Sequence, residues 1–296
     1  MNMSTIIDID ENRFSMNTSD LTYENSQSHK AISWSHTMDQ LNGKVAIITG
    51  AGSGIGRGSA IAIANAGAAV VVNDISEDVA NDTARAICDA GGAAKAHIGD
   101  VSDPEDVRCM VDLAVAEFGG LDVMHANAGV ERYVNLEEMA KADMDRLVEV
   151  DLIGVLLCAQ YAIAPMKKRG GGSIIFTSSV QATHSLPGCV VYAAAKAGVI
   201  ATARTLSLEV GSYGIRVNAI SPGTIDTPML TRDLADMNTN ESDAFLGRVK
   251  SANTLGRIGT VEEVGAAVVF LASDASSYIS GTNIVVDAGF TAVKSF

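Results

Sequence analysis

From residue 41 onward, the chain alternates short, almost wholly apolar runs with longer segments of helical periodicity. Continuous apolar runs are typical of strands buried on both faces, and the helices between them supply the covering layers. This order predicts an α/β fold in which one doubly wound parallel sheet forms a single domain. The predicted strands are 44–49, 69–73, 94–99, 121–125, 173–178, 215–220 and 283–286, with helices near 54–66, 77–90, 104–118, 143–168, 189–213 and 260–272.

Composition narrows the possible functions. The 296 residues carry a net charge of −14, which disfavours binding to nucleic acid or to anionic lipid. No apolar run looks long and uninterrupted enough to cross a bilayer, so no membrane partner is expected. The four cysteines are widely spaced, and we expect buried apolar side chains in a reducing cytoplasm rather than a metal site.

Residues 1–40 differ from the rest of the chain. They are polar, rich in Ser and Asn, and lack the basic start and apolar core of a secretory signal. We expect an N-terminal extension without fixed structure, to which we assign no function. Met38 is a second possible start of translation, and the folded domain is expected to span 41–296.

A glycine-rich turn follows the first predicted strand. It reads Gly50-Ala-Gly-Ser53-Gly54-Ile55-Gly56 and leads directly into a predicted helix. Glycines allow a sharp turn and let a pyrophosphate approach the helix N-terminus, where free N–H groups favour negative charge. A tight turn needs glycine in any case, but the strand–turn–helix setting favours a dinucleotide site at Gly50, Ser53, Gly54, Ile55 and Gly56.

The second predicted strand ends at Asp74. An acidic group at this place accepts hydrogen bonds from the adenosine ribose and repels a 2′-phosphate. The neighbours Asn73 and Ile75 carry no positive charge, so the sequence favours NAD over NADP. Asp74 also suits a cap for the next helix, and the two roles are compatible.

Tyr192 and Lys196 stand four residues apart in a predicted helix and therefore share one face. A free tyrosine has a pKa near 10, and a nearby ammonium, together with an oxidised nicotinamide ring, is expected to lower that pKa into the range of a useful acid/base. This spacing is common by chance on helices. Ser179, however, stands at the end of a predicted strand, where a parallel sheet exposes its ligand site.

In their order along the chain, these residues resemble the short-chain dehydrogenase/reductase family over essentially all of 41–296. The matching motifs are T-G-A-G-S-G-I-G at 49–56, G-D-V-S at 99–102, N-A-G at 127–129, Ser179, Y-A-A-A-K at 192–196 and S-P-G-T-I-D-T-P at 221–228. The stretches at 256–264 and 285–289 also look like the C-terminal pattern of the family.

The resemblance implies a Rossmann-type, seven-stranded parallel sheet and a homotetramer. It implies that Ser179 positions the substrate oxygen, that Tyr192 exchanges its proton, and that Lys196 tunes Tyr192 and holds the nicotinamide ribose. It further implies the cofactor contacts Asp100, Val101, Asn127, Gly223, Ile225 and Thr227.

Asp151 departs from the family pattern, which usually has asparagine in a V-N-L stretch where this chain has Val150-Asp151-Leu152. An aspartate accepts the hydrogen bonds of a lysine-linked water, but its charge favours protonated Lys196 and opposes a Tyr192 phenolate. We expect Asp151 to be a site residue; a helix-capping substitution is the alternative.

The combined prediction is an NAD-dependent oxidoreductase that acts on a secondary alcohol or ketone without a metal. Residues 226–254 are expected to form a substrate lid. The alternative is a non-catalytic dinucleotide-binding or sensing protein of the same fold.

Overall fold

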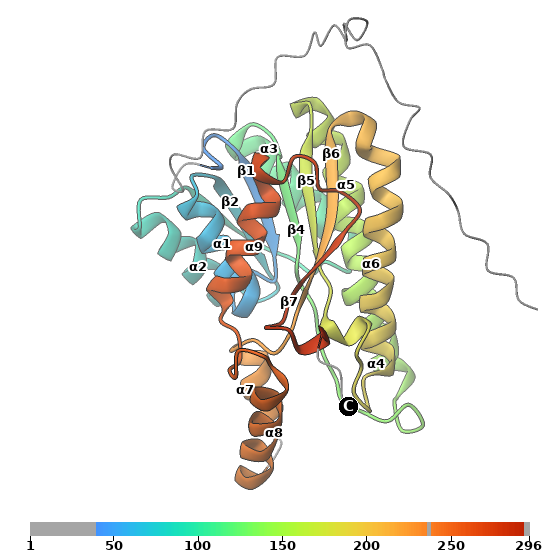
Figure 1. The fold of residues 1–296 in the computed structure, drawn as a ribbon. Coiled ribbons are helices and arrows are strands. Elements are labelled where there is room, and N and C mark those ends of the chain that lie inside the picture. The colour runs from blue at the N-terminus through green and yellow to red at the C-terminus, as the bar shows by residue number, and fades with distance from the viewer. Residues whose placement is uncertain (1–39, 236–237, 293–296) are drawn as a thin grey trace, which may run out of the picture. The chain divides into compact units, whose positions relative to one another are not determined.

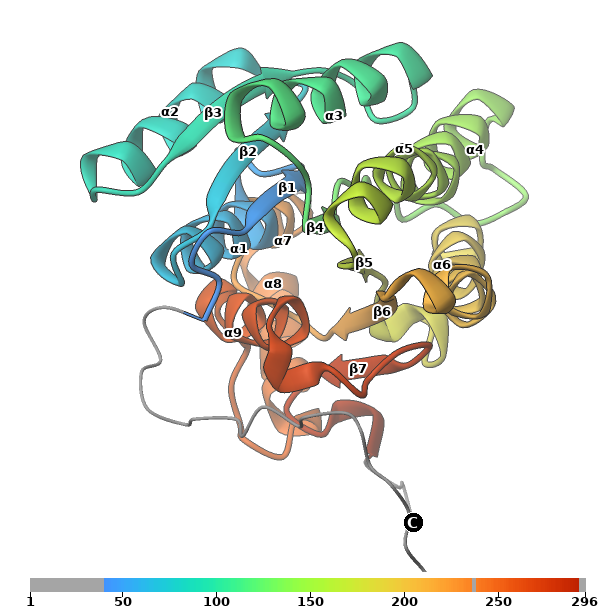
Figure 2. The ribbon, with the colours of Figure 1, turned by 90° about the horizontal axis from the view of Figure 1, so that it is seen from above.

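The computed structural model describes residues 40–235 and 238–292, which belong to one compact unit. Predictions for residues 1–39 and for 236–237 of the expected lid lie outside the described residues. A parallel sheet forms the centre of the unit, as predicted, with helices on both faces (Figures 1 and 2). The strands are β1 (Val45–Thr49), β2 (Ala69–Asp74), β3 (Ala94–Ile98), β4 (Val123–Ala126), β5 (Gly172–Thr177), β6 (Ile215–Pro222) and β7 (Asn283–Val286).

The order of the strands in the sheet is β3-β2-β1-β4-β5-β6-β7, and every pair is parallel. The chain first builds outward from β1 to β3 and then returns to place β4 on the other side of β1. Such a switch point leaves a crevice at the carboxyl ends of β1 and β4, where this fold class binds ligands. The fold confirms the predicted seven-stranded, doubly wound sheet.

Two apolar layers hold the helices on the sheet. On one face pack α3 (Pro104–Phe118), α5 (Gly154–Arg169) and α6 (Val190–Val210), and on the other α1 (Gly54–Asn65), α2 (Glu77–Asp89) and α9 (Val261–Ala272). Alanine and glycine on the facing sides of α1 and α9 allow close approach, since a Cβ added to Gly265 would lie 3.0 Å from Ala62. The covered strands explain the continuous apolar runs in the sequence.

The predicted helix 143–168 is interrupted. It consists of α4 (Lys141–Val148), a π-helical turn at Glu149–Ile153 and α5. Taken together, Lys141–Arg169 is long and apolar enough to cross a membrane by length and composition, with an 18-residue window of mean hydropathy 1.8, contrary to the prediction that no run is long enough. Its α5 portion packs in the sheet's apolar core, and this packing accounts for its hydropathy.

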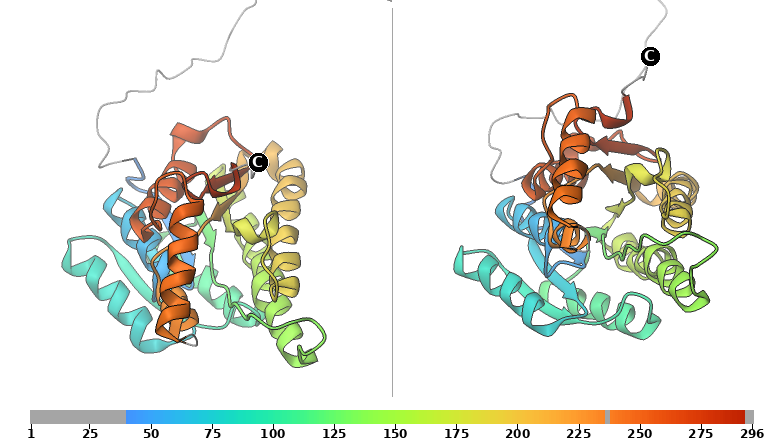
Figure 3. Two further views of the ribbon diagram at one scale, coloured as in Figure 1. Left: turned by 60° about the horizontal axis from the view of Figure 1, so that its bottom comes forward. Right: turned by 90° about the horizontal axis from the view of Figure 1, so that it is seen from below.

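The expected lid region contains two helices, α7 (Pro228–Ala235) and α8 (Thr239–Ala252). They project from the carboxyl edge of the sheet (Figures 1 and 3). None of the described residues of either helix is buried, so few apolar contacts tie them to the sheet. This weak attachment is what a movable cover requires.

Candidate active site

The glycine turn connects β1 to α1 at the switch point. Gly50 and Gly54 have φ angles of +61° and +52°, which favour glycine. A Cβ on Gly56 would lie 2.1 Å from the Gly50 carbonyl oxygen, so only glycine fits there. Ser53 is the N-cap of α1, and its side chain makes no hydrogen bond to the first helical turn, which contains Ile55. This open cradle at a helix N-terminus fits a dinucleotide pyrophosphate.

Asp74 lies at the end of β2, beside the turn. One carboxylate oxygen accepts a hydrogen bond from the Gly52 N–H at 3.0 Å, and the other accepts from the Ser76 N–H at 3.1 Å. Asp74 therefore fixes the glycine turn and the backbone that leads to Ser76, the N-cap of α2. Its position against the turn is compatible with the predicted second role beside a ribose.

Asp100 and Val101 follow β3, next to the same crevice. Asp100 accepts hydrogen bonds from Ser102 and from the Arg146 guanidinium, which donates at 2.9 Å. Partial burial raises the pKa of Asp100, but these bonds and the charge of Arg146 together lower it below its usual value. Sequence reasoning missed Arg146, which belongs to α4 and carries no local signal of this contact.

Asn127 joins the ends of three strands. Its amide donates to the Thr49 carbonyl at 3.0 Å, and its amide oxygen accepts from the Thr177 hydroxyl at 3.0 Å. The Thr49 hydroxyl in turn accepts from the backbone of Asn127 and Ala128. His125 contacts Thr177 at 2.9 Å, and burial lowers its pKa to about 3, so it is a neutral structural side chain.

Ser179, Tyr192 and Lys196 come together at the carboxyl end of β5. The Ser179 hydroxyl accepts from the Gln181 N–H at 3.1 Å and acts on Tyr192 so as to lower its pKa. Lys196 is 2% exposed, and its ammonium donates to the Thr177 carbonyl at 3.1 Å. The same ammonium lies 5.6 Å from the centre of the Tyr192 ring. The predicted constellation is thus assembled around two buried side chains of α6.

The pKa of Tyr192 differs from the sequence-based expectation. Burial raises it well above its ordinary value, the charges of Glu131 and Asp151 raise it further, and the hydrogen bond from Ser179 opposes them only in part. The sequence predicted a lowered pKa from Lys196 together with an oxidised nicotinamide ring. In the protein alone, burial raises the pKa, and the ammonium also lies 3.6 Å from the Asp151 carboxylate. Tyr192 is therefore a phenol at neutral pH in the protein alone.

Asp151 is the carboxylate that faces Lys196. It lies on the π-helical turn and is 0% exposed. Its Oδ1 accepts from the Val130 N–H at 2.9 Å and lies 3.6 Å from the Lys196 ammonium. Burial raises the pKa of Asp151, although the charge of Lys196 opposes that shift. Among the described residues Oδ2 has no hydrogen-bond partner. Since Oδ1 accepts from Val130, neither oxygen of Asp151 caps a helix.

Sequence reasoning also missed Glu131, in the loop after β4. Burial raises its pKa to about 7, a hydrogen bond from Tyr133 lowers it, and the charges of Asp233 and Asp151 raise it. Among the charges around Tyr192, that of Glu131 raises its pKa most. From the sequence it is indistinguishable from a solvated loop carboxylate.

The segment after β6 closes the other side of the crevice. The Gly223 N–H donates to the Val286 carbonyl at 3.0 Å, and Ile225 is buried. A Cβ added to Gly54 would lie 3.5 Å from Thr227, so this segment packs against the glycine turn. Thr227 therefore lies beside the cradle, and Gly223 and Ile225 precede it in the same segment.

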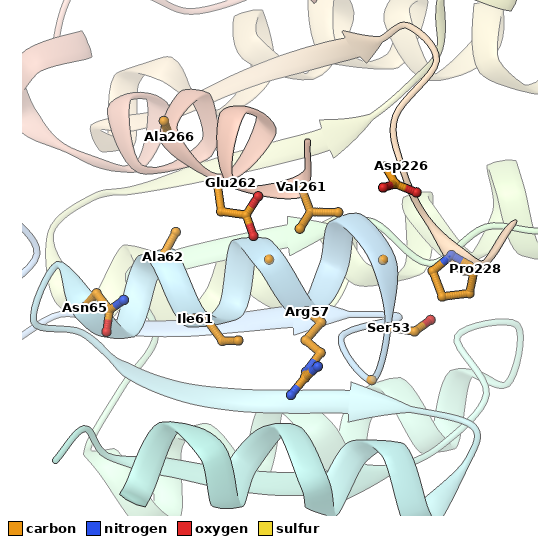
Figure 4. Close-up of a pocket in the computed structure, with 13 residues that line it drawn as sticks. Ser53, Arg57, Ile61, Ala62, Asn65, Asp226, Pro228, Val261, Glu262 and Ala266 are labelled. Carbon is orange, nitrogen blue, oxygen red and sulfur yellow. The ribbon is translucent and has the colours of Figure 1, made fainter. Parts of the chain in front are cut away.

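A groove between α1 and α9 begins at the outer side of the glycine turn (Figure 4). Ser53 and Arg57 line it together with Asp226, Val261 and Glu262. The lining of this groove does not include Ser179, Tyr192 or Lys196, so the groove is not where the reacting atoms lie. Within the described ranges no group of His, Cys, Asp and Glu side chains is arranged to hold a metal ion.

Comparisons with known proteins agree with this architecture. A family model described as enoyl-(acyl carrier protein) reductase matches residues 50–291. The cis-4-hydroxycyclohexanecarboxylate dehydrogenase of Sinomonas cyclohexanicum is 41% identical over 251 residues, 84% of this chain and 97% of the relative. A cyclohexanol dehydrogenase from an Acinetobacter species is 35% identical over 254 residues, 86% of this chain and 97% of the relative.

Among solved structures, a gluconate 5-dehydrogenase from Burkholderia cenocepacia, in complex with NADP and tartrate, superposes with a TM-score of 0.81. It is 36% identical, and the match covers 88% of this chain and 100% of that one. The chain belongs to the short-chain dehydrogenase/reductase family, and its fold and relatives make it an oxidoreductase.

Proposed function

We propose that this protein is an NAD-dependent oxidoreductase that transfers a hydride between the nicotinamide and a secondary alcohol or ketone, with Tyr192 as the acid/base. The observation that carries the proposal is the placement of Ser179 and Tyr192 at the carboxyl edge of the sheet with the buried Lys196, whose ammonium lies 5.6 Å from the centre of the Tyr192 ring. Two relatives are named as dehydrogenases of ring alcohols, which supports a secondary alcohol or ketone as substrate.

The dinucleotide supplies the hydride chemistry when it is bound. The N–H groups at the start of α1 would hold its pyrophosphate, and Asp74 would accept hydrogen bonds from the adenosine ribose. Asp100 and Val101 would border the adenine, Asn127 the adenosine ribose, and Ile225 and Thr227 the nicotinamide amide. Lys196 would hold the nicotinamide ribose.

The protein's own side chains manage the proton. In reduction the Tyr192 hydroxyl donates its proton to the substrate oxygen, and in oxidation the phenolate accepts it. Ser179 holds that oxygen in place. Since burial keeps Tyr192 protonated at neutral pH, the protein is prepared for ketone reduction, whereas alcohol oxidation needs a higher pH or the positive charge of an oxidised nicotinamide.

Asp74 gives a direct test of cofactor choice. We expect kcat/KM with NADH to exceed that with NADPH on one ketone by at least about tenfold, because the carboxylate repels a 2′-phosphate at close range. Asp74→Asn keeps an acceptor for the Gly52 N–H and removes the charge, so the ratio should move toward NADPH. A clear NADPH preference of the unaltered protein would overturn the role of Asp74.

The charge of Asp151 is testable through the pH profile. Asp151 raises the pKa of Tyr192, so Asp151→Asn should move the rising limb of alcohol oxidation to lower pH. The midpoint of log kcat against pH reports the shift. An unchanged midpoint with unchanged kcat would mean that Asp151 does not act on Tyr192.

A second candidate function rests on the same residue. Because Asp151 and Glu131 both oppose a Tyr192 phenolate, a dinucleotide-binding sensor without turnover is the alternative. A panel of secondary alcohols and ketones separates the two. Tight NADH binding without hydride transfer to any of them would favour the sensor.

We further propose that residues 41–296 are the catalytic domain, that the segment around α7 and α8 closes over the substrate, and that the enzyme is a cytoplasmic homotetramer. The weak burial of both helices supports the lid. Exposed apolar side chains on α5 and α6, such as Leu156 at 40% and Leu208 at 85% exposure, support subunit contacts. The free state of all four cysteines supports a reducing compartment.

A further inference from the structure

A histidine lies in the middle of the sheet. His125 belongs to β4, the central strand, which runs between β1 and β5 (Figure 2). It pairs in register with Ile48 and Ile175, which both belong to the apolar layer beneath α1 and α9. Its side chain is 0% exposed, and burial keeps the imidazole neutral by lowering its pKa. A neutral imidazole has one N–H, so one ring nitrogen donates and the other only accepts.

Thr177 determines which nitrogen of His125 carries the proton. The Thr177 hydroxyl donates its single hydrogen to the Asn127 amide oxygen at 3.0 Å. His125 Nε2 lies 2.9 Å from the same hydroxyl oxygen and must therefore donate to it. In the opposite tautomer Thr177 would donate to His125, and the Asn127 oxygen would lose the donor that the described residues give it. The hydrogen bonds thus run in one direction, from His125 through Thr177 to Asn127.

This direction fixes the amide of Asn127 at the cofactor cradle. While Thr177 holds the amide oxygen, the amide nitrogen donates to the Thr49 carbonyl at 3.0 Å. The same nitrogen lies against the glycine turn, since a Cβ added to Gly56 would be 2.6 Å from it. Its second N–H has no acceptor within the described part of the chain and is available to an oxygen of the dinucleotide. A reversed amide would place two acceptors, its own oxygen and the Thr49 carbonyl, against each other.

The other ring nitrogen of His125 shows that the imidazole is not there for the core. Nδ1 is buried and has no hydrogen-bond partner among the residues that the structure describes. An acceptor left unpaired in an apolar interior destabilises the fold, and an aliphatic side chain at the same place would avoid that loss. The benefit of the imidazole therefore lies in the bond that it donates to Thr177.

We propose that His125 and Thr177 are positioning residues for the dinucleotide, because together they hold the Asn127 amide with its N–H end at the glycine turn. The inference rests on the dinucleotide site of the proposed function, in which Asn127 borders the adenosine ribose. His125 acts only through the Thr177 hydroxyl. The backbone carbonyl of Thr177, which accepts from Lys196 at 3.1 Å, is kept when either side chain is replaced.

A double-mutant cycle tests this chain of hydrogen bonds. The two readouts are the dissociation constant for NADH, from calorimetric titration, and the free energy of unfolding, from denaturant. Thr177→Val keeps the shape of the side chain and removes the hydroxyl, so the dissociation constant should rise about fivefold, the size of one neutral hydrogen bond. It also leaves the His125 N–H without an acceptor, so the stability should fall. Adding His125→Leu removes that donor, and the stability should return while the dissociation constant stays raised.

Single variants and controls complete the cycle. His125→Leu alone should raise the dissociation constant about twofold, because a hydroxyl that no longer accepts from the imidazole donates more weakly. Thr177→Ser keeps the hydroxyl and should restore the affinity for NADH. The matched control is Ser173→Ala, which removes a buried hydroxyl at the other end of β5, where it donates to the Leu271 carbonyl at 2.8 Å. This control should lose stability with no change in the dissociation constant.

An NADH dissociation constant that Thr177→Val leaves unchanged overturns the inference, and so does an effect of His125→Leu that persists beside Thr177→Val. The proposed function then stands, because ketone reduction by the unaltered enzyme tests it separately. The expected coupling without turnover of any alcohol or ketone would support the inference and contradict the proposed function. If the unaltered protein binds only NADPH, the same cycle is measured with NADPH, and binding of neither dinucleotide overturns both proposals.

Discussion

Replacing Tyr192 with phenylalanine is expected to lower kcat/KM for ketone reduction by about a thousandfold, within the range that general acid catalysis contributes. The substitution removes the hydroxyl that Ser179 contacts and leaves the buried ring in place. The glycine turn and Asp74 lie on other elements, so the dissociation constant for NADH should change little. Steady-state rates and NADH titration of the same preparation measure both effects.

Tyr213→Phe is the matched control, because Tyr213 is 47% exposed and its ring lies beneath the Lys167 ammonium at 3.4 Å. It should retain the activity of the unaltered enzyme. Full activity of Tyr192→Phe would rule out the assigned acid/base, and a parallel loss of NADH affinity would show that the substitution damages the cofactor site.

Replacing Lys196 with methionine is expected to damage both stability and turnover. The variant leaves Asp151 buried without its ammonium partner, and breaking such a pair costs about 3 kcal/mol of unfolding free energy. The loss should be smaller at pH 5 than at pH 8, because burial already raises the pKa of Asp151 and acid returns it to the neutral form. Denaturant unfolding at the two pH values measures the difference.

The double variant Lys196→Met with Asp151→Asn separates the two effects of Lys196. It contains no unpaired buried charge at this place, so most of the lost stability should return while turnover stays low. Lys168→Met, an exposed lysine of α5, should leave both quantities unchanged. Equal stability of Lys196→Met at pH 5 and pH 8 would contradict the role of Asp151 as the unpaired charge.

Much of the fold was predictable because its signals are local. The runs that became β1 and β2 are apolar up to the polar residues at their carboxyl ends, and only strands covered on both faces allow such continuous apolar runs. Gly56 was predictable for a similar reason. The Gly50 carbonyl oxygen that leaves no room for a side chain at Gly56 belongs to the same short turn. The pair Tyr192 and Lys196 was predictable from helical spacing alone.

The interruption between α4 and α5 was not predictable, because a single π-helical turn leaves the apolar periodicity almost unchanged. That turn places Asp151 beneath the loop after β4. The hydrogen bond of Arg146 with Asp100 and the electrostatic effect of Glu131 on Tyr192 join residues that are distant in the chain. Neither the hydropathy pattern nor the spacing of residues in the sequence predicts interactions between such distant residues.

The amino-acid sequence by itself determined the doubly wound sheet, the glycine cradle and the side chains that gather near it, because apolar periodicity and short-range spacing specify them. Tertiary structure alone decided the electrostatic state of Tyr192. Burial and the charges of Glu131 and Asp151 raise its pKa, although the sequence places an ammonium one helical turn away. The physical reason is that a pKa depends on desolvation and on every nearby charge, and both are set by how distant segments pack.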